Sequence, residues 1–322
     1  MKDFITEYGH TKERLKELQA LPLERKVGFT AARIAEWYNH FNGKVYVSFS
    51  GGKDSTVLLH LVRSLFPDVK AMYVNTGLEY PEIVQFVKTF DNVDIIRPKI
   101  SFKQVIEKYG YPVIGKEVSH HLSIAKTSPN GKVAKFFLDN KENPKFGTPY
   151  DFSKYSYLLD APFKISASCC KVMKKSPASS YAKETGLSPI TAQMAEESRL
   201  RRQLWLKQGC NAFSVNRPIS NPMSFWTEQD VLEYIARKKI KIAPVYGDVL
   251  GCPGGRYTTG CHRTGCVFCL FGIKQDGTPN RIQRLAKTHP ALWKYCIYTL
   301  GMKEVMEFLQ VPYEPEDKLL EL

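Results

Sequence analysis

The sequence predicts an α/β protein with a doubly wound parallel sheet, followed by a cysteine-rich metal lobe and C-terminal helices. Strand-like runs and helical stripes alternate from residue 44 to residue 97, which is typical of a parallel sheet with crossover helices. A glycine-bearing loop joins the first of these strands to the first helix. Glycines and cysteines dominate residues 247–277, which favours a loop-built metal site there.

The composition places the chain among globular proteins. It has 322 residues, of which 43% are hydrophobic and 24% are charged, so disorder, collagen and coiled coil are excluded. The formal net charge of +14 favours a surface or cleft that meets phosphates, in a nucleic acid or a nucleotide. A basic surface without any such partner is the alternative.

No 18-residue apolar run occurs, and the opening MKDFITEYGHTKERLKEL has no apolar core behind its charges. We therefore expect no membrane partner, no signal peptide and a cytoplasmic protein. Disulfides rarely persist in the cytoplasm, yet six of the eight cysteines fall in two tight groups. This grouping indicates a metal or sulfur chemistry, whereas Cys210 and Cys296 are expected to be ordinary buried thiols.

The elements are expected in the following order. An N-terminal segment, 1–43, carries helices over 9–20 and 24–40, and a nucleotide-binding domain spans 44–245. In that domain strands are predicted over 44–49, 69–75, 93–97 and 189–194, and helices after the glycine loop and over 81–90, 196–207 and 227–238. Thr227 is the expected N-cap of the last helix, with Asp230 at its third position.

Two regions depart from this alternation. The pattern weakens over about 110–165, which we interpret as an insertion with long loops. The segment 246–322 is expected to form the cysteine-rich loop region and, over 279–309, terminal helices.

The glycine loop has the features of a phosphate-binding turn. A Walker A motif is excluded because Val47 and Asp54 occupy the positions where it needs glycine and Ser or Thr. Free amides and the positive end of a helix dipole nevertheless meet an anion at such a strand-to-helix loop. A plain glycine turn is the alternative. The candidate residues are Ser50, Gly51, Gly52, Lys53, Asp54 and Ser55.

The run SFSGGKDS resembles the PP-loop of the adenine nucleotide α-hydrolase superfamily. Asn75-Thr76-Gly77-Leu78-Glu79-Tyr80-Pro81-Glu82 and Trp226-Thr227-Glu228-Gln229-Asp230-Val231 resemble two motifs of the phosphoadenosine phosphosulfate (PAPS) reductase family within that superfamily. The resemblance extends over roughly residues 44–270, and the order and spacing of its motifs make it more specific than the loop alone.

The resemblance implies an adenine nucleotide partner: ATP, adenylyl sulfate (APS) or PAPS. It implies that the loop residues hold the phosphate or sulfate end, with Thr76 and Gly77 near the adenosine. Ser198 and Arg201 match a stretch that binds anionic groups of the substrate. In related ATPases a nearby acidic residue positions magnesium, a role that Asp54 is expected to share with helix capping.

The cysteine pattern resembles that of the APS branch of the family and of DNA phosphorothioation enzymes. Cys169 and Cys170 are followed, after 95 intervening residues, by Cys266 and Cys269, an arrangement that resembles the one that holds a [4Fe–4S] cluster in the APS branch. Neighbouring lysines favour the thiolates that such a cluster needs.

Zinc is the alternative cofactor. Cys252, Cys261, Cys266 and Cys269, with His262, lie close in sequence and have the residue types of a structural zinc site. That reading leaves the vicinal pair unexplained. Plain thiols, and Cys261 as an alternative cluster ligand, also stay open.

Two departures from the reductase pattern argue against sulfate reduction. Reductases of this type end with a cysteine-bearing tail whose thiolate attacks the nucleotide, but this sequence has no cysteine after Cys296. Where they carry a pair of arginines, this chain has Met194 and Ala195, although Arg199 and Arg202 partly substitute.

The favoured function is therefore sulfur transfer by a PP-loop enzyme with a [4Fe–4S] cluster, as in thiolation or phosphorothioation. The expected partners are tRNA or DNA as acceptor and a protein that donates sulfur or electrons. The alternatives are an APS or PAPS reductase with a relocated or partner-supplied thiol, and a non-catalytic nucleotide-binding Fe–S module.

Overall fold

The computed structural model describes residues 9–138, 152–214 and 216–315. Contacts within the chain separate two compact units, each made of segments that are not consecutive in sequence. Unit 1 consists of Met1–Asn75, Tyr80–Ile96 and Ala178–Thr264, and unit 2 of Thr76–Glu79, Arg97–Pro177 and Gly265–Leu322. The expected division at residues 43 and 245 stays a prediction.

Unit 1 contains the main sheet, with strand order β3-β2-β1-β5-β7-β6. The first five strands of this order are parallel, and β6 runs antiparallel to β7. The strands are β1 (Val45–Ser48), β2 (Lys70–Val74), β3 (Val93–Ile96), β5 (Ser188–Ile190), β6 (Asn211–Ala212) and β7 (Ile219–Ser220). This mostly parallel arrangement confirms the predicted α/β class.

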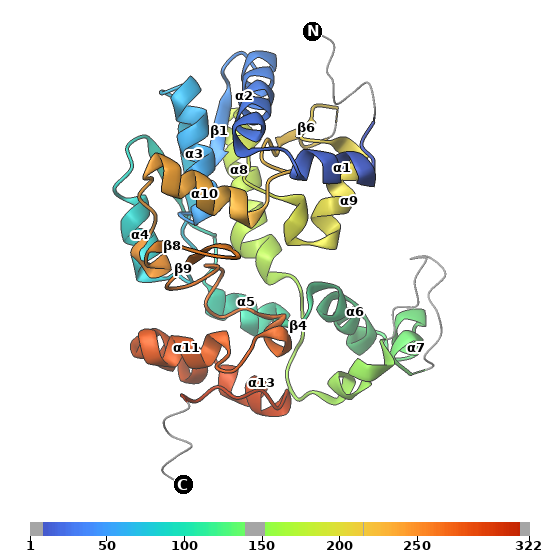
Figure 1. Ribbon diagram of the computed structural model, residues 1–322. Helices are drawn as coiled ribbons and strands as arrows, with labels where there is room; N and C mark the ends of the chain where they lie inside the picture. Colours follow the sequence, from blue (N-terminus) through green and yellow to red (C-terminus); the bar gives the residue numbers. More distant parts are fainter. Residues whose placement is uncertain (1–8, 139–151, 215, 316–322) are drawn as a thin grey trace. The chain divides into compact units, whose positions relative to one another are not determined.

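The central strand β1 is buried on both faces, which is why its sequence is apolar without alternation. Val47 lies in register with Ala71 of β2 and with Ile190 of β5. Tyr46 packs with Met72 and with Tyr181 of α8 (Ser176–Thr185) on one face of the sheet. Helices α2 (Leu23–His40), α3 (Lys53–Leu65) and α10 (Glu228–Lys238) pack together in the same unit (Figure 1).

The strand order reverses at β1, which has β2 on one side and β5 on the other. Chain segments leave these neighbouring strands in opposite directions at such a point, and the gap outside their carboxyl ends is where ligands bind in open α/β sheets. The glycine loop follows β1 directly, so the fold places it at this switch point.

The remaining elements of unit 1 are α1 (Lys12–Gln19), α4 (Pro81–Val87), η4 (Ala195–Glu197), α9 (Arg199–Gln208), η5 (Pro244–Tyr246) and the hairpin of β8 (Val249–Cys252) with β9 (Gly255–Thr258). Thr227 and Asp230 form a capping box at the start of α10, as predicted. The buried Lys26 of α2 donates to Asp230 over 2.6 Å, which ties the N-terminal helices to α10.

Unit 2 is mostly helical. Its elements are α5 (Phe102–Tyr109), β4 (Val113–Ile114), α6 (Lys116–Thr127), α7 (Lys132–Leu138), η2 (Ser153–Asp160), η3 (Lys171–Lys175), β10 (Leu270–Phe271), η6 (Ile273–Gln275), α11 (Arg281–Thr288), α12 (Pro290–Lys294), η7 (Tyr295–Thr299) and α13 (Met302–Phe308). Strands β4 and β10 pair in parallel, which joins the segment after Cys269 to the segment before α6. No helix in the described ranges has the length and apolar character that crossing a bilayer requires.

Two expectations about local structure are wrong. The region 110–165 is not mainly loop, because α6, α7 and η2 form there; residues 139–151 lie outside the described residues. Leu122 of α6 and Phe137 of α7 are buried, so each helix has an apolar face. The Gly, Pro and Asn residues nearby hid this helical spacing in the sequence. The cysteine-rich region is likewise not all loop, since Val249 to Thr258 form the β8–β9 hairpin.

Candidate functional site: a phosphate loop and a cysteine cavity

The turn at Ser50–Lys53 has a backbone that only glycine fits. Gly51 has φ of +72°, and a Cβ there would lie 2.8 Å from Cγ2 of Val87 and 2.9 Å from Cγ2 of Ile83. Gly52 is the residue before α3 and has no side chain to cap the helix. The turn thus brings bare backbone amides to the start of α3, close to its packed neighbour α4.

Two serines brace the loop from inside. Ser50 N–H donates to Ser55 Oγ over 3.1 Å, and Gly52 N–H lies 3.3 Å from Ser50 Oγ. Ser55 Oγ in turn donates to the carbonyl of Gly52 over 2.9 Å. The loop geometry is therefore fixed by its own side chains.

Lys53 is buried, with 2% of its surface exposed, and it has several acceptors in unit 1. Its Nζ lies 3.0 Å from Glu228 Oε1 and 3.6 Å from Asp54 Oδ1, and it donates to the carbonyl of His262 over 3.1 Å. Burial acts to lower the pKa of Lys53, but the carboxylates of Asp54 and Glu228 outweigh it and raise that pKa. The ammonium is charged and held by protein oxygens.

The first backbone amide of α3 is also occupied. Lys53 N–H donates to the hydroxyl of Tyr246 over 3.2 Å, and this hydroxyl forms a second bond of 2.6 Å with Thr264 Oγ1. Tyr246 is buried, which raises the pKa of its phenol. The tyrosine hydroxyl thus lies where an anion would meet the start of the helix. Nothing in the sequence Pro-Val-Tyr indicates this contact.

Asp54 lies in the first turn of α3, where the helix dipole favours a carboxylate. Its Oδ1 is buried and accepts no hydrogen bond. A buried carboxylate oxygen whose one printed contact is the 3.6 Å ion pair with Lys53 has the chemistry of a ligand for a hard cation such as Mg²⁺.

The other predicted anion-binding residues of unit 1 have structural partners. Ser198 caps α9 by accepting from Arg201 N–H over 3.2 Å, and Arg201 forms an ion pair with Glu197. Met194 and Ala195, which replace the arginines of the reductase pattern, are buried in the core. Their burial shows that these two positions now serve packing.

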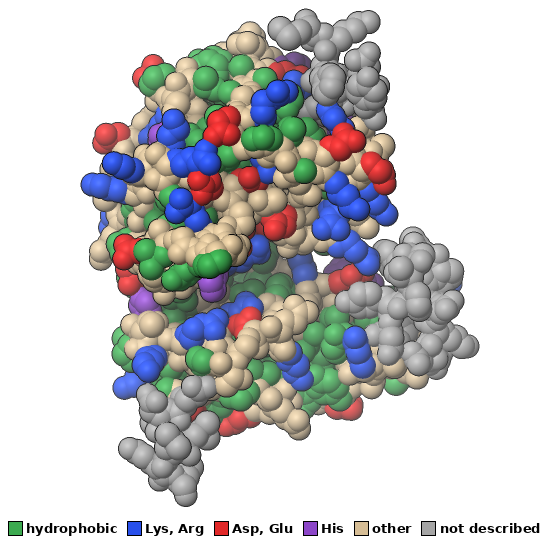
Figure 2. All heavy atoms as spheres, in the orientation of Figure 1, with side chains coloured by type: hydrophobic (Ala, Val, Ile, Leu, Met, Phe, Trp, Pro, Cys, Tyr) green, Lys and Arg blue, Asp and Glu red, His purple; other side chains and the backbone are tan. Residues whose placement is uncertain are grey.

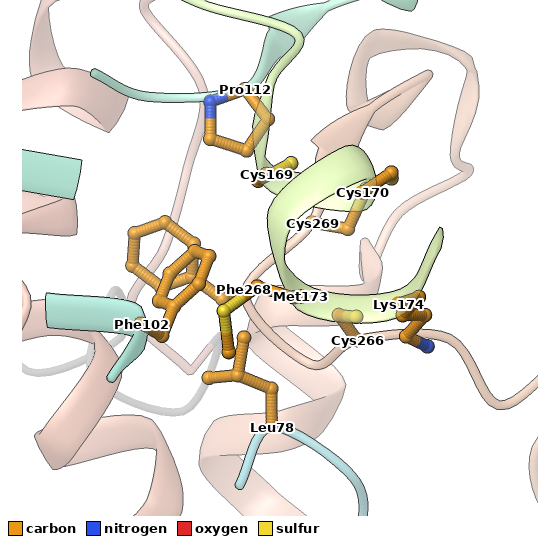
Figure 3. Close-up of a pocket in the computed structure, with 10 residues that line it drawn as sticks. All are labelled: Leu78, Phe102, Pro112, Cys169, Cys170, Met173, Lys174, Cys266, Phe268 and Cys269. Atoms are coloured by element: carbon orange, nitrogen blue, oxygen red, sulfur yellow. The ribbon is translucent and has the colours of Figure 1, made fainter. Parts of the chain in front are cut away.

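Unit 2 brings the four predicted cluster cysteines to one cavity. Cys169 and Cys170 precede the π-helical turn η3, and Cys266 and Cys269 flank the turn before β10. The cavity encloses about 330 Å³ of space not filled by protein atoms, part of it open to solvent. Figure 3 shows the cysteines around η3. The remaining lining residues are Leu78, Phe102, Pro112, Met173, Lys174 and Phe268.

The pKa values of the two vicinal thiols are shifted in opposite directions. A hydrogen bond from Cys169, helped by Lys116 and Lys174, lowers the pKa of Cys170 to about 6, against the effect of its burial. The same hydrogen bond and burial raise the pKa of Cys169. Burial also raises the pKa of Cys266, to about 11, although Lys174 beside it acts in the opposite direction.

Thr76 and Gly77 belong to unit 2, together with the cysteines, and not to the unit of the phosphate loop. Thr76 N–H donates to Glu79 Oε2 over 3.0 Å and its hydroxyl donates to Glu79 Oε1 over 2.7 Å. Lys174 Nζ lies 3.7 Å from the same carboxylate. Glu79 therefore connects the predicted adenosine segment to the lysine that stands beside Cys266.

The remaining cysteines separate into two kinds. Cys210 and Cys296 are buried, as predicted, and burial raises the pKa of Cys296 to about 12. Cys252 is exposed on β8 and Cys261 follows the hairpin, so both belong to unit 1 and neither lines the cavity.

The chain was compared with known proteins. Its residues 44–137 and 145–270 match the sequence model of the phosphoadenosine phosphosulfate reductase domain. Among curated proteins it is 30% identical over 123 residues to uncharacterized protein MJ0973 of Methanocaldococcus jannaschii, covering 37% of this chain and 28% of that protein. It is 25% identical over 266 residues to uncharacterized protein MJ0066 of the same organism, covering 81% of this chain and 42% of that protein.

The chain thus spans less than half the length of either curated relative. Among solved structures, the phosphoadenylyl-sulfate reductase of Candida auris, in a phosphate complex, aligns with a TM-score of 0.38 and 14% identity. That alignment covers 73% of this chain and 90% of the reductase. The family match extends over more than half of the chain, including the phosphate loop and all four cavity cysteines. The chain therefore belongs to the phosphoadenosine phosphosulfate reductase domain family.

Proposed function

We propose that this chain is a sulfur-transfer enzyme that binds ATP, APS or PAPS through Ser50–Ser55 and holds a [4Fe–4S] cluster through Cys169, Cys170, Cys266 and Cys269. The main support for the cluster is the cavity of unit 2. Four thiols line it, although 95 residues separate their two segments. A cavity lined by four thiols has the donor set of a cluster bound by four cysteines.

The donor set supports a cluster more than the alternative zinc site. That zinc site would use Cys252 and Cys261, but both lie in unit 1 and neither lines the cavity. It would also leave the vicinal pair without a role, whereas a four-iron cluster takes four thiolates. When bound, such a cluster would supply electrons or sulfur; zinc stays the alternative cofactor.

The protein residues have separate duties in this proposal. The loop amides and Lys53 would hold the phosphate end of the nucleotide, and Asp54 Oδ1 would offer one ligand to a magnesium ion that accompanies it. Lys174 and Lys116 would offset the negative charge of four thiolates.

The test is anaerobic purification followed by two measurements. Iron analysis should give about four irons per chain with brown colour, on the precedent of Cys₄-ligated clusters. Calorimetry with ATP, APS and PAPS should show binding that Lys53→Ala weakens at least tenfold, because charged hydrogen bonds contribute about 1.5–3 kcal/mol. Lys70→Ala is the matched control, since Lys70 lies in the same unit but pairs with Asp94. Stoichiometric zinc without iron, or unchanged nucleotide affinity in Lys53→Ala, would contradict the proposal.

A nucleic acid is the proposed acceptor, supported by the charge of +14 and by α9. Figure 2 shows Lys and Arg side chains gathered over the region of α9, where Arg199, Arg202 and Lys207 are exposed. Binding of tRNA or duplex DNA should weaken steeply as salt rises, because phosphate contacts release counterions. Binding that does not change with salt would argue against this acceptor class.

Sulfonucleotide reduction is the competing function. Cys296 is the candidate for a relocated thiol nearest the C-terminus, but that side chain is fully buried and its pKa is raised to about 12. Such a thiol is a poor nucleophile at neutral pH. We expect no reductase-like release of sulfite from APS or PAPS with thioredoxin as donor. Sulfite release that Cys296→Ser abolishes would restore the reductase assignment.

A further inference from the structure

The segment that follows the β8–β9 hairpin is fastened to the phosphate loop at two points. The carbonyl of His262 accepts from Lys53 Nζ over 3.1 Å, and Thr264 Oγ1 lies 2.6 Å from the Tyr246 hydroxyl that holds Lys53 N–H. The residue between these anchors is Arg263. Its backbone is therefore fixed beside the start of α3, within unit 1.

The side chain of Arg263 is exposed, and no described residue offers it a hydrogen bond or an ion pair. Its positive charge nevertheless acts on Arg201 of α9: burial first, and then Arg263, lower the pKa of Arg201, while Asp54 raises it. Two guanidiniums, one of them without a carboxylate partner, thus stand near Lys53 and Asp54.

Like charges held together without a full set of partners favour an anion between them. Glu197 pairs with Arg201, and Glu228 pairs with Lys53, but Arg263 has no such counterion among the described residues. Glu228 reaches Lys53 from the first position of α10, so a carboxylate oxygen already occupies one position that an anionic ligand would take.

Two positions that carry arginine in the reductase pattern carry apolar residues in this chain. Met194 and Ala195 are buried, and no guanidinium can act from there. Arginine provides the planar, two-pronged donor that suits phosphate and sulfate groups. In this chain an exposed arginine stands at residue 263, on a different segment of the fold, directly after the residue whose carbonyl accepts from Lys53.

We propose that Arg263 is a nucleotide-binding residue that, together with Lys53 and Arg201, contacts the terminal anionic group of the nucleotide. The proposal rests on nucleotide binding at Ser50–Ser55 and adds the residue that sets the charge requirement of that site. The ligand class is an adenosine ester with two or more linked acidic groups, such as ATP or APS. A nucleoside with a single phosphate would reach the loop amides but leave Arg263 without a partner.

The experiment compares Arg263→Gln and Arg263→Lys with the unaltered chain in calorimetric titrations with ATP, APS and AMP. We expect Arg263→Gln to weaken ATP and APS binding about 10–100-fold, because a charged hydrogen bond contributes about 1.5–3 kcal/mol. AMP binding should change less than twofold. Arg263→Lys should recover only part of the loss, since an ammonium cannot bind in two-pronged fashion.

Arg237→Gln is the matched control, because Arg237 is an exposed arginine of unit 1 that pairs with Glu233 and Glu24. It changes net charge by the same amount and should leave all three affinities unchanged. Equal losses in Arg237→Gln and Arg263→Gln would reduce the effect to general charge and overturn the proposal. Equal losses for ATP and AMP would overturn it too.

Different results would contradict nucleotide binding by the loop and the role of Arg263. If Lys53→Ala leaves nucleotide binding intact, the loop does not bind nucleotide and the proposed function itself falls. If Lys53→Ala weakens binding while Arg263→Gln leaves ATP and APS affinity unchanged, nucleotide binding stands and the role of Arg263 is wrong. Thermal melting of each variant checks that an affinity loss does not come from unfolding.

Discussion

The phosphate loop and the cysteine cavity differ in how their polar groups are satisfied. In the loop, Lys53 has Glu228 and His262 as partners, and its amide has Tyr246. In the cavity, a hydrogen bond from Cys169 lowers the pKa of Cys170, and burial raises the pKa of Cys266, which lies beside Lys174. Lys53 and its amide thus have protein oxygens as partners, whereas the pKa values of the cavity thiols are set by burial, by one another and by neighbouring lysines.

This difference predicts different costs of ligand removal. A bound nucleotide would have to exchange with Glu228 on Lys53, so we expect the loop to keep its structure without one. The cavity thiols come from two distant segments, and metal binding would contribute directly to the folding of unit 2.

Cys170→Ser should produce the largest change. A serine oxygen is a poor ligand for iron, so the content of about four irons per chain and the visible absorbance should both be lost. ATP affinity, measured by calorimetry, should stay within about twofold if the loop is complete by itself. Cys252→Ser is the control, because Cys252 is exposed and lines no part of the cavity. Iron lost equally in both variants would contradict the cysteine assignment.

Tyr246→Phe should destabilise unit 1. The change leaves Lys53 N–H without its acceptor and removes the bond to Thr264, at a cost of about 1–3 kcal/mol in the free energy of unfolding. Urea titration followed by circular dichroism measures it. Tyr257→Phe, on the exposed surface of β9, should cost almost nothing. An equal effect of both changes would show that the hydroxyl of Tyr246 does not support the loop.

Glu228→Gln should strengthen nucleotide binding. The neutral amide competes less well than a carboxylate for Lys53, so ATP affinity should rise about fivefold, the equivalent of roughly 1 kcal/mol. Glu233→Gln is the control on the same helix, since Glu233 pairs with Arg237 and Arg256 instead. A loss of affinity in Glu228→Gln would mean that Glu228 positions Lys53 for the nucleotide and does not compete with it.

Tyr181→Phe should have the smallest effect and a defined pH dependence. The hydroxyl of Tyr181 lowers the pKa of Asp94 below its ordinary 3.8, assisted by Lys70 and opposed by burial. A carboxyl with a lowered folded-state pKa stabilises the protein above pH 3.8 and loses that contribution as pH falls through the folded value. Solvent screens the pair, so the variant should lose only about 0.5 kcal/mol.

Urea titrations at pH 7 and at pH 3 measure this dependence. The difference between Tyr181→Phe and the unaltered chain should be present at pH 7 and shrink at pH 3. A difference that is the same at both pH values would show that the hydroxyl of Tyr181 does not act through the charge of Asp94.

Local patterns predicted the parts of the fold that depend on local chemistry. The strand–loop–helix at residues 44–65 and the capping box of Thr227 and Asp230 follow from hydrophobic spacing and side-chain hydrogen bonding. The helices over 116–138 were missed because glycine, proline and asparagine interrupt the region, while tertiary packing of residues such as Leu122 decides its structure.

The candidate sites show the same division. The sequence identified the loop and the four cysteines that line the cavity, because each forms a short motif. It did not identify Glu228, Tyr246 or Thr264 as partners of the loop, since they lie more than 170 residues from Lys53. Glu228 lies in the motif Trp226–Val231, at a position where the family pattern specifies no residue. Its place in that motif was the only sequence signal of a contact with the loop.

The alternation of chain segments between the two units sets an order of events during protein synthesis. Cys169 and Cys170 leave the ribosome before Cys266, with 95 residues between Cys170 and Cys266, and the last segment of unit 1 is made in the interval. At typical elongation rates this interval lasts roughly 5–20 s. The nascent chain therefore carries a vicinal dithiol without its partner thiols while the sheet of unit 1 receives its last strands, and assembly of the four-thiol cavity must follow.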